Sequence, residues 1–348
     1  MNAYKKQILT LVMVLFAIVL GTNAQEPKVL FIGNSYTEYN NLPEVLKMLA
    51  NSNGDSLKYV SNTPGGCTFQ QHLFNQSASY IRQGDWDYVV LQEQSQIPSF
   101  PDNDFYNICY PYAQQLCQMI NQYCSDAQTV FYMTWGRKYG DQQNCQIFPP
   151  LCTYEGMDSL LYLRYMIMAE DNDAWVSPVG ALWHYIRDNH PDIDLYGSDG
   201  SHPSAAGTYA AACSFYALIY GKTPLNSPYT FSLSDQVAKT IQKAAETVVY
   251  DSLSKWRFEG GETSIIRQTE ENDIHIKPNP AGDAVTVISD ESISEINIYS
   301  VDGRLVDKRK VDGLSEVQLD VSMLKAGCYM MQVIGKQQYN KIIKFIKR

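Results

Sequence analysis

Short apolar runs alternate with helix-patterned segments over most of this chain, and no other feature restricts its possible folds as strongly. Five of the runs have the length of buried strands and end at Gly, Pro or polar residues. They occupy residues 28–33, 57–66, 86–95, 127–135 and 174–178. Because such alternation is typical of βαβ units, it predicts a parallel sheet that is covered by helices on both faces.

The helix-patterned segments repeat their apolar residues at intervals of three and four. They occupy residues 42–52, 68–84, 108–124, 155–171, 180–190, 210–221 and 235–256. We interpret each as helical, including 108–124, which has Pro111 in its first turn. In parallel sheets of this class, functional sites lie beyond the carboxyl ends of the strands. The polar residues that follow the strands are therefore the candidates for function.

The first residues have the pattern of an export signal. Lys5 and Lys6 precede a short apolar run over 8–20, and small residues follow up to Ala24. This order predicts a signal peptide over 1–24, with a retained membrane anchor as the alternative. The run is short for a membrane span and no second candidate follows it, so we expect no transmembrane helix in the mature protein.

After the main domain, which we expect at 25–258, the sequence changes character. Residues 259–273 are polar and contain a Gly-Gly pair, which is typical of a linker. Over 274–348, apolar and polar residues alternate between turn residues. This pattern predicts a second domain, a small all-β sandwich.

Charge is distributed unevenly along the chain. Residues 25–273 carry 28 acidic and 14 basic side chains, whereas residues 274–348 carry 9 and 11. An acidic domain repels the phosphates of nucleic acids and of anionic membranes, so we expect neither as its partner. The charge does not restrict neutral substrates such as sugars and esters.

Export permits disulfides, so the eight cysteines matter. Cys145 and Cys152 stand seven residues apart in a loop-like stretch and could close a small ring. Cys109, Cys117 and Cys124 recur at about two-turn spacing and could share one helix face. Buried, unpaired cysteines are the alternative. Because the sequence has no CxxC and no paired-His spacing, we expect no metal site.

Three polar residues have the chemistry of a serine hydrolase. Ser35 follows the first strand in a Gly-Asn-Ser sequence, where it could act as a nucleophile or only cap the next helix. Asp199 and His202 stand three residues apart, just before a proline and a helix. On a tight loop this spacing lets the carboxylate orient the imidazole, whose other nitrogen would take the serine proton.

Acyl transfer by a serine also needs hydrogen-bond donors for the charge that develops on the carbonyl oxygen. The backbone N–H groups of Ser35 and Gly66 are two candidates. Gly66 belongs to a Pro-Gly-Gly turn after the second strand, where no Cβ keeps the backbone away. A side-chain amide after the third strand, from Gln94 or Gln92, would be the third donor.

The order of these elements resembles the SGNH hydrolase superfamily, the GDSL-like esterases. The resemblance implies a three-layer α/β/α flavodoxin-like fold. It implies Ser35 as nucleophile, His202 as base and Asp199 as the acid that orients the base. It further implies an oxyanion hole formed by Ser35, Gly66 and Gln94, with no metal or organic cofactor.

The resemblance extends over roughly Lys28 to Tyr220, and the sequence departs from the family pattern in two blocks. Asn34 stands where many relatives have Asp, which leaves the serine in place. At the third block many relatives have Gly-x-Asn-Asp, and this chain has Gln-Glu-Gln-Ser. Gln94 occupies the Asn position, but carbohydrate-esterase relatives with Gln-Gly-Glu in this block make Gln92 a competing donor.

Two residues after the fourth strand could line the substrate cleft. Trp135 and Arg137 follow this strand directly, where side chains reach the site edge of the sheet. We expect both to contact substrate, and Arg137 could meet an acidic sugar. A solvated loop is the alternative.

The C-terminal segment resembles the C-terminal sorting domain of the type IX secretion system in Bacteroidetes. The resemblance depends on Pro-Asn-Pro at 278–280, on Gly-x-Tyr at 327–329 and on the basic end at 341–348. It implies that 274–348 engages the type IX machinery. It also implies that the protein passes through the periplasm to the outer-membrane surface or the medium. An appended carbohydrate-binding or adhesion sandwich is the alternative.

The sequence therefore predicts a secreted or surface-attached serine esterase that acts through an acyl-enzyme. The family and the location lead us to expect an acylated glycan as the ester substrate, for instance one that loses acetyl groups. One alternative is a lipase or thioesterase-like acylhydrolase. Another is a catalytically silent glycan-binding or adhesion protein on the same fold, although the intact Ser35, Asp199 and His202 argue against it.

Overall fold

The computed structural model describes two parts of the chain, and each is considered by itself. The described residues are 26–258, 274–279, 281–300, 305–325, 327–335 and 340–347. The predicted signal peptide over 1–24 and the predicted linker over 259–273 lie outside the described residues, so both stay predictions.

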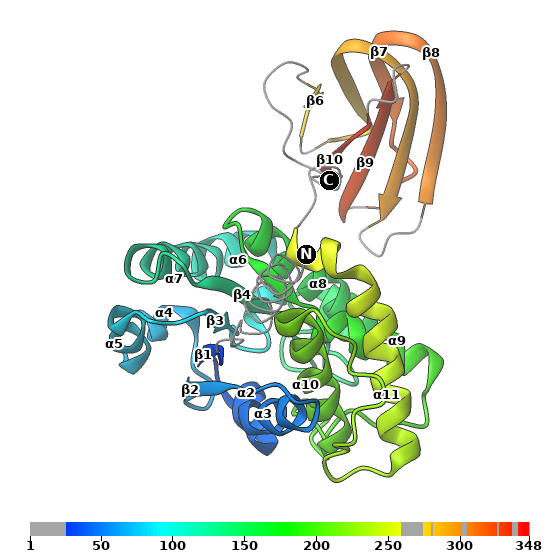
Figure 1. The fold of residues 1–348 in the computed structure, drawn as a ribbon. Helices are drawn as coiled ribbons and strands as arrows, with labels where there is room; N and C mark the ends of the chain where they lie inside the picture. The colour runs from blue at the N-terminus through cyan, green and yellow to red at the C-terminus, as the bar shows by residue number, and fades with distance from the viewer. Residues whose placement is uncertain are drawn as a thin grey trace, which may run out of the picture.

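The first part is built on a five-stranded parallel sheet (Figure 1). Its strands are β1 (Lys28–Ile32), β2 (Lys58–Asn62), β3 (Tyr88–Leu91), β4 (Gln128–Tyr132) and β5 (Trp175–Ser177). Each strand lies within a run predicted from the sequence. The order in the sheet is β2-β1-β3-β4-β5, and all neighbouring pairs are parallel. This is the flavodoxin-like order, so the predicted fold class is confirmed.

Helices cover both faces of this sheet. The α-helices are α2 (Ser35–Glu38), α3 (Leu42–Ser52), α4 (Phe69–His72), α5 (Gln76–Gln83), α6 (Asp102–Ile108), α7 (Tyr110–Tyr123), α8 (Tyr154–Glu170), α9 (Val179–Asn189), α10 (Ala205–Tyr220), α11 (Asp235–Val248) and α12 (Leu253–Arg257). The 3₁₀ turns are η1 (Tyr39–Asn41), η2 (Ile97–Ser99), η3 (Pro149–Cys152) and η4 (Tyr250–Ser252). One layer joins α3, α9, α10 and α11, and the other joins α4, α5 and α7 (Figure 1).

Segments 68–84 and 235–256, which have helical spacing, are each divided in the structure, whereas segment 108–124 forms essentially one helix. Segment 68–84 forms α4 and α5 because Asn75 is extended and caps α5, accepting a hydrogen bond from the N–H of Ser77 at 2.8 Å. Segment 235–256 forms α11, η4 and α12, whereas α7 occupies most of segment 108–124, with Pro111 in its first turn as predicted. Proline fits a first helical turn but not a helix interior. The cap at Asn75 thus overrides the apolar spacing within segment 68–84.

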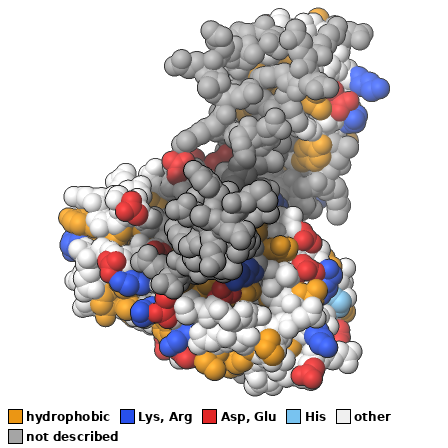
Figure 2. All heavy atoms as spheres, in the orientation of Figure 1, with side chains coloured by type: hydrophobic (Ala, Val, Ile, Leu, Met, Phe, Trp, Pro, Cys, Tyr) orange, Lys and Arg blue, Asp and Glu red, His pale blue; other side chains and the backbone are white. Residues whose placement is uncertain are grey.

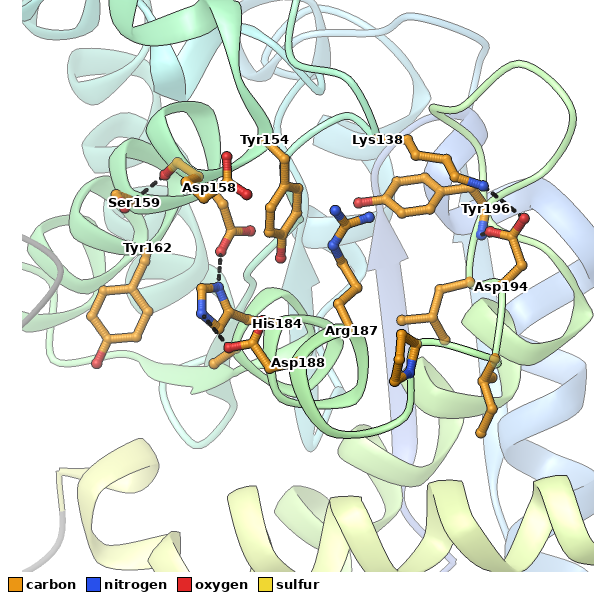
Figure 3. A pocket seen from close by; sticks show the side chains of 15 residues that line it. Lys138, Tyr154, Asp158, Ser159, Tyr162, His184, Arg187, Asp188, Asp194 and Tyr196 are labelled. Carbon is orange, nitrogen blue, oxygen red and sulfur yellow. Dashed lines mark hydrogen bonds and ion pairs between the residues drawn. The ribbon is translucent and has the colours of Figure 1, made fainter.

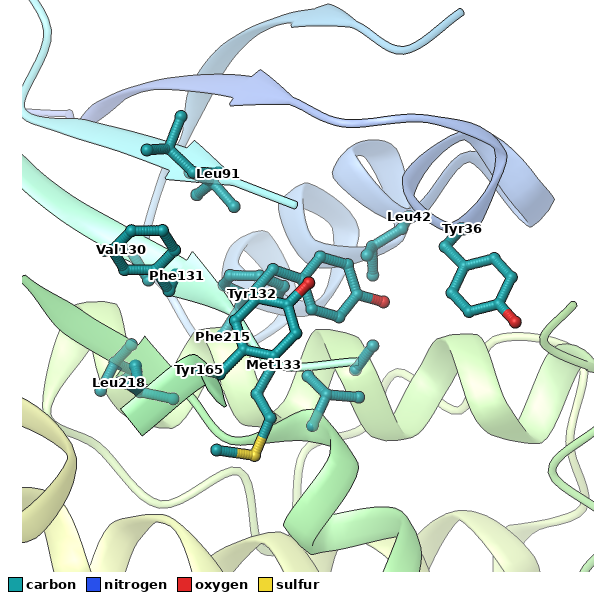
Figure 4. Close-up of a cluster of buried hydrophobic side chains, with 14 of the residues drawn as sticks. Tyr36, Leu42, Leu91, Val130, Phe131, Tyr132, Met133, Tyr165, Phe215 and Leu218 are labelled. Atoms are coloured by element: carbon teal, nitrogen blue, oxygen red, sulfur yellow. The ribbon is translucent and has the colours of Figure 1, made fainter. Parts of the chain in front are cut away.

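The core of the first part fills both faces of the sheet. Tyr132 meets Phe215 of α10 edge to face with ring centroids 5.1 Å apart, and Phe131 meets Tyr165 of α8 at 6.4 Å (Figure 4). Because neighbouring strand residues point to opposite faces, these two contacts belong to the two helical layers. They fix β4 between the layers and so position the loop that follows it.

The second part is entirely β-structure, as predicted. Its strands are β6 (Ile274–Lys277), β7 (Ala284–Ser300), β8 (Leu305–Asp320), β9 (Gly327–Gly335) and β10 (Asn340–Lys347). All their pairings are antiparallel, and β7 has register shifts between Ile288 and Glu295. Alternate residues of β7 and β9, among them Val285, Val287 and Met331, form a separate apolar core.

Two of the cysteines form the expected disulfide, and three others match the alternative of buried, unpaired thiols. Cys145 and Cys152 form a disulfide, as their spacing suggested. Cys109, Cys117 and Cys124 are buried and unpaired. The first lies between α6 and α7, the second within α7 and the third at its end, so they do not belong to one continuous helix.

Acidic and basic side chains are interspersed on the face of the first part that Figure 2 shows, without a basic patch. No helix of the described residues is long and apolar enough to cross a bilayer. Nor do these residues include a group of three or more His, Cys, Asp or Glu side chains that could hold a metal ion.

Candidate active site

Ser35 lies immediately beyond the carboxyl end of β1, as the first residue of α2. The strand ends because Gly33 and Asn34 follow the apolar run, and extended Asn34 caps α2 by accepting a hydrogen bond from the N–H of Tyr36 at 3.1 Å. Ser35 is half-buried between buried neighbours. A first helical residue has no intrahelical acceptor for its N–H, so Ser35 presents both its hydroxyl and its N–H at this edge of the sheet.

Gln92, directly after β3, fixes the turn that precedes Ser35. Its Oε1 accepts hydrogen bonds from Asn34 N–H and from Thr37 Oγ1, each at 2.9 Å, and its Nε2 donates to Asn34 Oδ1 at 3.0 Å. A Cβ on Gly33 would lie 2.6 Å from both Gln92 Oε1 and Thr37 Oγ1, so only glycine fits there. Because Gln92 is completely buried, water does not compete for these bonds.

Asp199 and His202 stand on the loop between α9 and α10, and the loop's own backbone holds it in a tight turn. The N–H of Gly197 donates to His202 O at 2.7 Å. Gly200 has a φ of +67°, a conformation that favours glycine. Asp199 Oδ1 accepts hydrogen bonds from the N–H groups of Ser201 and His202, each at 2.9 Å. The turn therefore points the Asp199 carboxyl back toward its own segment.

A continuous chain of hydrogen bonds connects Asp199, His202 and Ser35. Asp199 Oδ2 lies 2.5 Å from His202 Nδ1, and His202 Nε2 lies 2.8 Å from Ser35 Oγ. Burial opposes ionisation of Asp199, but hydrogen bonds from His202 and Ser201 outweigh it and hold the pKa of this carboxyl below its ordinary value. An ionised Asp199 accepts the Nδ1–H of His202, which leaves Nε2 to accept the serine proton.

Two tyrosine rings hold the imidazole of His202. Tyr39 stacks on it with ring centroids 4.4 Å apart, and Tyr36 meets it edge to face at 5.4 Å. Tyr36 is itself fixed, because it stacks on Trp135 at 4.7 Å and its hydroxyl lies 2.7 Å from Ser201 Oγ. The contacts limit rotation of the imidazole away from Ser35.

Asn40 joins the serine segment to the histidine loop. It lies in η1 with a φ of +53°, which asparagine tolerates better than most residues. Its Nδ2 donates to Thr208 Oγ1 at 2.9 Å, to Pro203 O at 3.2 Å and to Ser204 O at 3.3 Å. Asn40 therefore fixes the distance between the two loops that carry Ser35 and His202.

Sequence analysis did not single out Tyr36, Tyr39 or Asn40. The sequence signal that could have identified them is their position within five residues after a candidate nucleophile. Side chains in the first one or two turns of a helix stay close to the residue at which the helix begins. That signal alone does not say which of them face the histidine, since the histidine loop lies more than 160 residues further along the chain.

Gly66 lies in the turn after β2 with a φ of +67°, a backbone conformation that favours glycine. The turn is held beside the serine segment because Asn34 Nδ2 donates to Cys67 O at 3.0 Å. A Cβ on Gly66 would meet nothing within 4 Å. Glycine is thus favoured here by the backbone angle, and the structure brings Gly66 to the sheet edge where Ser35 lies.

The two candidate amide donors differ in what they already bind. The turn before Ser35 uses both ends of the buried Gln92 amide. Gln94 is half-buried, and its Nε2 donates to Gln96 Oε1 at 3.1 Å, which uses one of two amide hydrogens. No hydrogen bond within the described residues joins Gln94 to Ser35 or Gly66, so its role stays a prediction.

Of the two residues expected to line the substrate cleft, Trp135 is completely buried, which contradicts that expectation. Its indole stacks on Trp183 of α9 at 3.8 Å and donates to Ser201 O at 3.1 Å, so it supports the histidine loop from inside. The sequence does not show that α9 covers the end of β4. Arg137 is partly exposed, lies 3.3 Å from Asp141 and stays a predicted substrate contact.

Glu93, between the two glutamines, is a buried carboxyl that sequence analysis did not single out. Its Oε1 accepts hydrogen bonds from the N–H groups of Phe69 at 3.0 Å and Gln94 at 2.6 Å, whereas Oε2 has no partner in the described part of the chain. Burial raises the pKa of Glu93 to about 8, against the lowering effect of these hydrogen bonds. Glu93 thus ties the start of α4, which follows the Gly66 turn, to the end of β3.

Glu93→Gln is expected to make the protein less sensitive to alkaline pH. The native state keeps a proton that the unfolded state releases between pH 4.5 and about 8, so the free energy of unfolding of the wild type falls as pH rises through this window. The fall amounts to roughly 3 to 5 kcal/mol. Glutamine keeps the Oε1 acceptor without the ionisation. Urea unfolding at pH 5 and pH 9 would measure the free energy of unfolding of the wild type and the variant. The prediction would be contradicted if the two proteins differed by the same amount at both pH values.

Comparison with known proteins identifies the second part of the chain. Residues 275–348 match the family model of the secretion system C-terminal sorting domain, as the sequence pattern predicted. Such a tail sends its carrier through type IX secretion, so the protein is exported to the cell surface or released. No curated protein matches the chain in sequence.

Solved structures resemble the first part. A DUF4886 family protein from Bacteroides uniformis aligns with 70% of this chain and 100% of its own, at 17% identity and a TM-score of 0.56. A candidate SGNH hydrolase from Slackia heliotrinireducens aligns with 56% and 100%, at 24% identity and 0.47. A carbohydrate acetylesterase from Sinorhizobium meliloti aligns with 56% and 99%, at 13% identity and 0.37. The first match shows that the chain shares the fold of the DUF4886 protein.

Proposed function

We propose that this exported protein is a serine acylhydrolase of the SGNH type, which cleaves esters through an acyl-enzyme. The observation that supports the proposal best is the continuous hydrogen-bonded chain from Asp199 through His202 to Ser35. Three side chains in this order have the nucleophile, base and orienting acid that acyl transfer requires. The half-buried Ser35 hydroxyl is the only one of the three groups that must reach a substrate carbon.

In the proposed reaction, His202 Nε2 takes the proton of Ser35 Oγ as the oxygen bonds to the ester carbonyl carbon. The tetrahedral intermediate collapses, the alcohol leaves with the proton from Nε2, and the acyl group stays on Ser35. Water then repeats the sequence with Nε2 as base, which releases the acid and restores the serine. Asp199 stays ionised throughout and stabilises the imidazolium that forms twice.

The oxyanion is proposed to accept hydrogen bonds from the N–H of Ser35, the N–H of Gly66 and the amide of Gln94. The first is free for a ligand because it starts a helix, and the second belongs to the turn that Asn34 holds beside the serine. Gln94 is preferred to Gln92 because the Gln92 amide already serves the turn. Donors fixed by such networks cost no rearrangement during the reaction.

We propose acylated glycans, acetylated ones among them, as the substrate class. The type IX sorting tail brings the protein to the outside of the cell, where glycans are available. The rival activities are a lipase or thioesterase-like acylhydrolase, and glycan binding without catalysis.

Covalent labelling tests the proposal directly. The full chain would be treated with a fluorophosphonate probe, and the modified peptide would be identified by mass spectrometry. We expect modification at Ser35 in the wild type and none in Ser35→Ala or His202→Ala, all three folded by circular dichroism. A folded wild type without modification would contradict a serine hydrolase. A rate that rises from acetyl to decanoyl esters would favour the lipase instead.

A further inference from the structure

A separate pocket lies between α8, α9 and the segment that follows α9 (Figure 3). Its volume is about 790 Å³, within the usual range of ligand sites in proteins. Its wall is formed by aromatic, aliphatic and charged side chains, among them Tyr154, Tyr162, His184, Arg187 and Tyr196. Ser35, Asp199 and His202 do not line it, so the proposed reaction gives the pocket no role.

Arg187 is the central cation of this pocket, and its guanidinium lies against two tyrosine rings. Its guanidinium lies 3.8 Å from the ring centre of Tyr154 and 5.4 Å from that of Tyr196, and Figure 3 shows it between them. No carboxylate forms an ion pair with it among the described residues. A guanidinium stacked on a ring keeps its N–H donors at the edge, so Arg187 presents a pre-oriented fork to a ligand.

The other charges of the pocket, apart from Glu155, form ion pairs within the described residues. Lys138 Nζ lies 2.7 Å from Asp194 Oδ2. His184 Nδ1 lies 2.9 Å from Asp158 Oδ2, and its Nε2 lies 3.3 Å from Asp188 Oδ2. The hydrogen bond that His184 Nδ1 donates to the Asp158 carboxylate raises the pKa of His184.

The balance of charge selects among ligands. Four carboxylates line the pocket, from Glu155, Asp158, Asp188 and Asp194, against the permanent cations Lys138 and Arg187. Even with His184 protonated the lining is net negative, which disfavours an anionic ligand. The charged groups that line the pocket also disfavour a fatty acyl chain. Such a chain would remove water molecules from these groups and could not form hydrogen bonds in their place.

We propose that this pocket binds a neutral saccharide. Sugar hydroxyls both donate and accept, so they match carboxylates and a guanidinium fork that lie side by side. The half-buried ring of Tyr162 adds an apolar face against which the C–H groups of a sugar ring can pack. The pocket thus offers what a neutral, hydroxyl-rich ligand needs and what anionic or purely apolar ligands lack.

The position of the pocket connects it to the proposed active site. Tyr196 lines the pocket and forms an isolated antiparallel β-bridge with Pro203. The segment between these two residues contains Asp199 and His202. The N–H of Lys138, on the pocket wall, donates to Gly200 O at 2.8 Å within the same turn. A glycan anchored in the pocket would therefore lie next to the histidine loop. Its role as the anchor of an acylated substrate rests on the proposed esterase function, whereas saccharide binding itself does not.

Binding of unacylated oligosaccharides to the full chain tests the inference. Isothermal titration calorimetry would use cellohexaose, xylohexaose and mannohexaose as neutral probes and hexagalacturonic acid as the acidic probe. We expect at least one neutral probe to bind and Arg187→Ala to weaken that binding roughly tenfold or more. Arg82→Ala is the matched control, because Arg82 lies 6.0 Å from the ring centre of Tyr123 on an exposed face of α5.

Three results would overturn the inference: no neutral probe binds, the acidic probe binds more tightly than all three, or Arg187→Ala binds as the wild type does. If Arg187→Ala fails to fold, Arg187→Lys replaces it in the test, because lysine keeps the positive charge but loses the forked N–H donors of the guanidinium. Unchanged binding of the neutral probe by Arg187→Lys would then overturn the inference. The probes contain no ester, so their binding is independent of Ser35 labelling. Labelling without binding refutes the pocket alone, and binding without labelling refutes the esterase alone.

Discussion

Ser35→Ala is expected to lower kcat for hydrolysis of 4-nitrophenyl acetate by roughly 10⁴-fold or more, as removal of the nucleophile does in well-studied serine hydrolases. Alanine removes the only oxygen that His202 Nε2 contacts at 2.8 Å, so no acyl-enzyme can form. The turn should be unchanged, because its hydrogen bonds come from Asn34, Thr37 and Gln92. Steady-state kinetics with purified full chain would measure the loss.

The matched control is Ser125→Ala, which removes an exposed serine in the turn after α7. We expect it to hydrolyse the ester at the wild-type rate. A folded Ser35→Ala protein that retains more than about one hundredth of the wild-type kcat would contradict the proposed nucleophile. Burst-phase release of nitrophenol in the wild type, absent from Ser35→Ala, would show that the acyl group passes through this residue.

The features that could be predicted from the sequence are those with local causes. β1 ends at Gly33 and Asn34 because apolar residues stop there, and that end places Ser35 at the edge of the sheet. Asp199 and His202 meet because they stand three positions apart in one tight turn that contains Gly200. Alternation of strands and helices predicts the parallel sheet, whereas the flavodoxin-like arrangement is implied only by the family resemblance, since alternation fits more than one strand order.

What escaped prediction depends on contacts between distant segments. The burial of Trp135 follows from α9, which begins more than 40 residues later. The stacking of Tyr39 on His202 joins residues more than 160 positions apart. The pKa of Glu93 follows from its burial behind α4 and β3 and not from its neighbours in sequence. Apolar spacing and turn residues contain no information about such pairings.

Asn34 departs from the pattern of the SGNH family that the sequence resembles, in which many members have aspartate. The structure gives a physical explanation for the asparagine. Asn34 Oδ1 accepts from the N–H of Tyr36 and from Gln92, while its Nδ2 donates to Cys67 O at 3.0 Å. An ionised aspartate could accept the first two bonds but could not donate the third. In this chain, asparagine therefore links the serine turn to the turn of Gly66, which an acidic residue would not do.

Asp199→Asn is expected to lower kcat for the same ester by roughly 10⁴-fold, with KM little changed. The carboxylate accepts Nδ1–H of His202 at 2.5 Å and stabilises the imidazolium that forms when Ser35 loses its proton. An asparagine has no charge for that purpose. If its NH₂ faces Nδ1, the ring proton moves to Nε2, which then cannot accept from serine. Steady-state kinetics between pH 5 and pH 9 would measure the effect.

The pH dependence tests whether the Asp199 carboxylate acts in its ionised form. Because the pKa of Asp199 is held below its ordinary value, the wild-type carboxylate stays ionised across the whole range from pH 5 to pH 9. Its contribution would be lost only as pH falls through that lowered pKa, so the low kcat of the variant should persist at every pH in this range. Asp126→Asn, an exposed aspartate beside Ser125, should have no effect. A ratio of wild-type to variant kcat near one at neutral pH would show that His202 does not depend on Asp199 for its orientation.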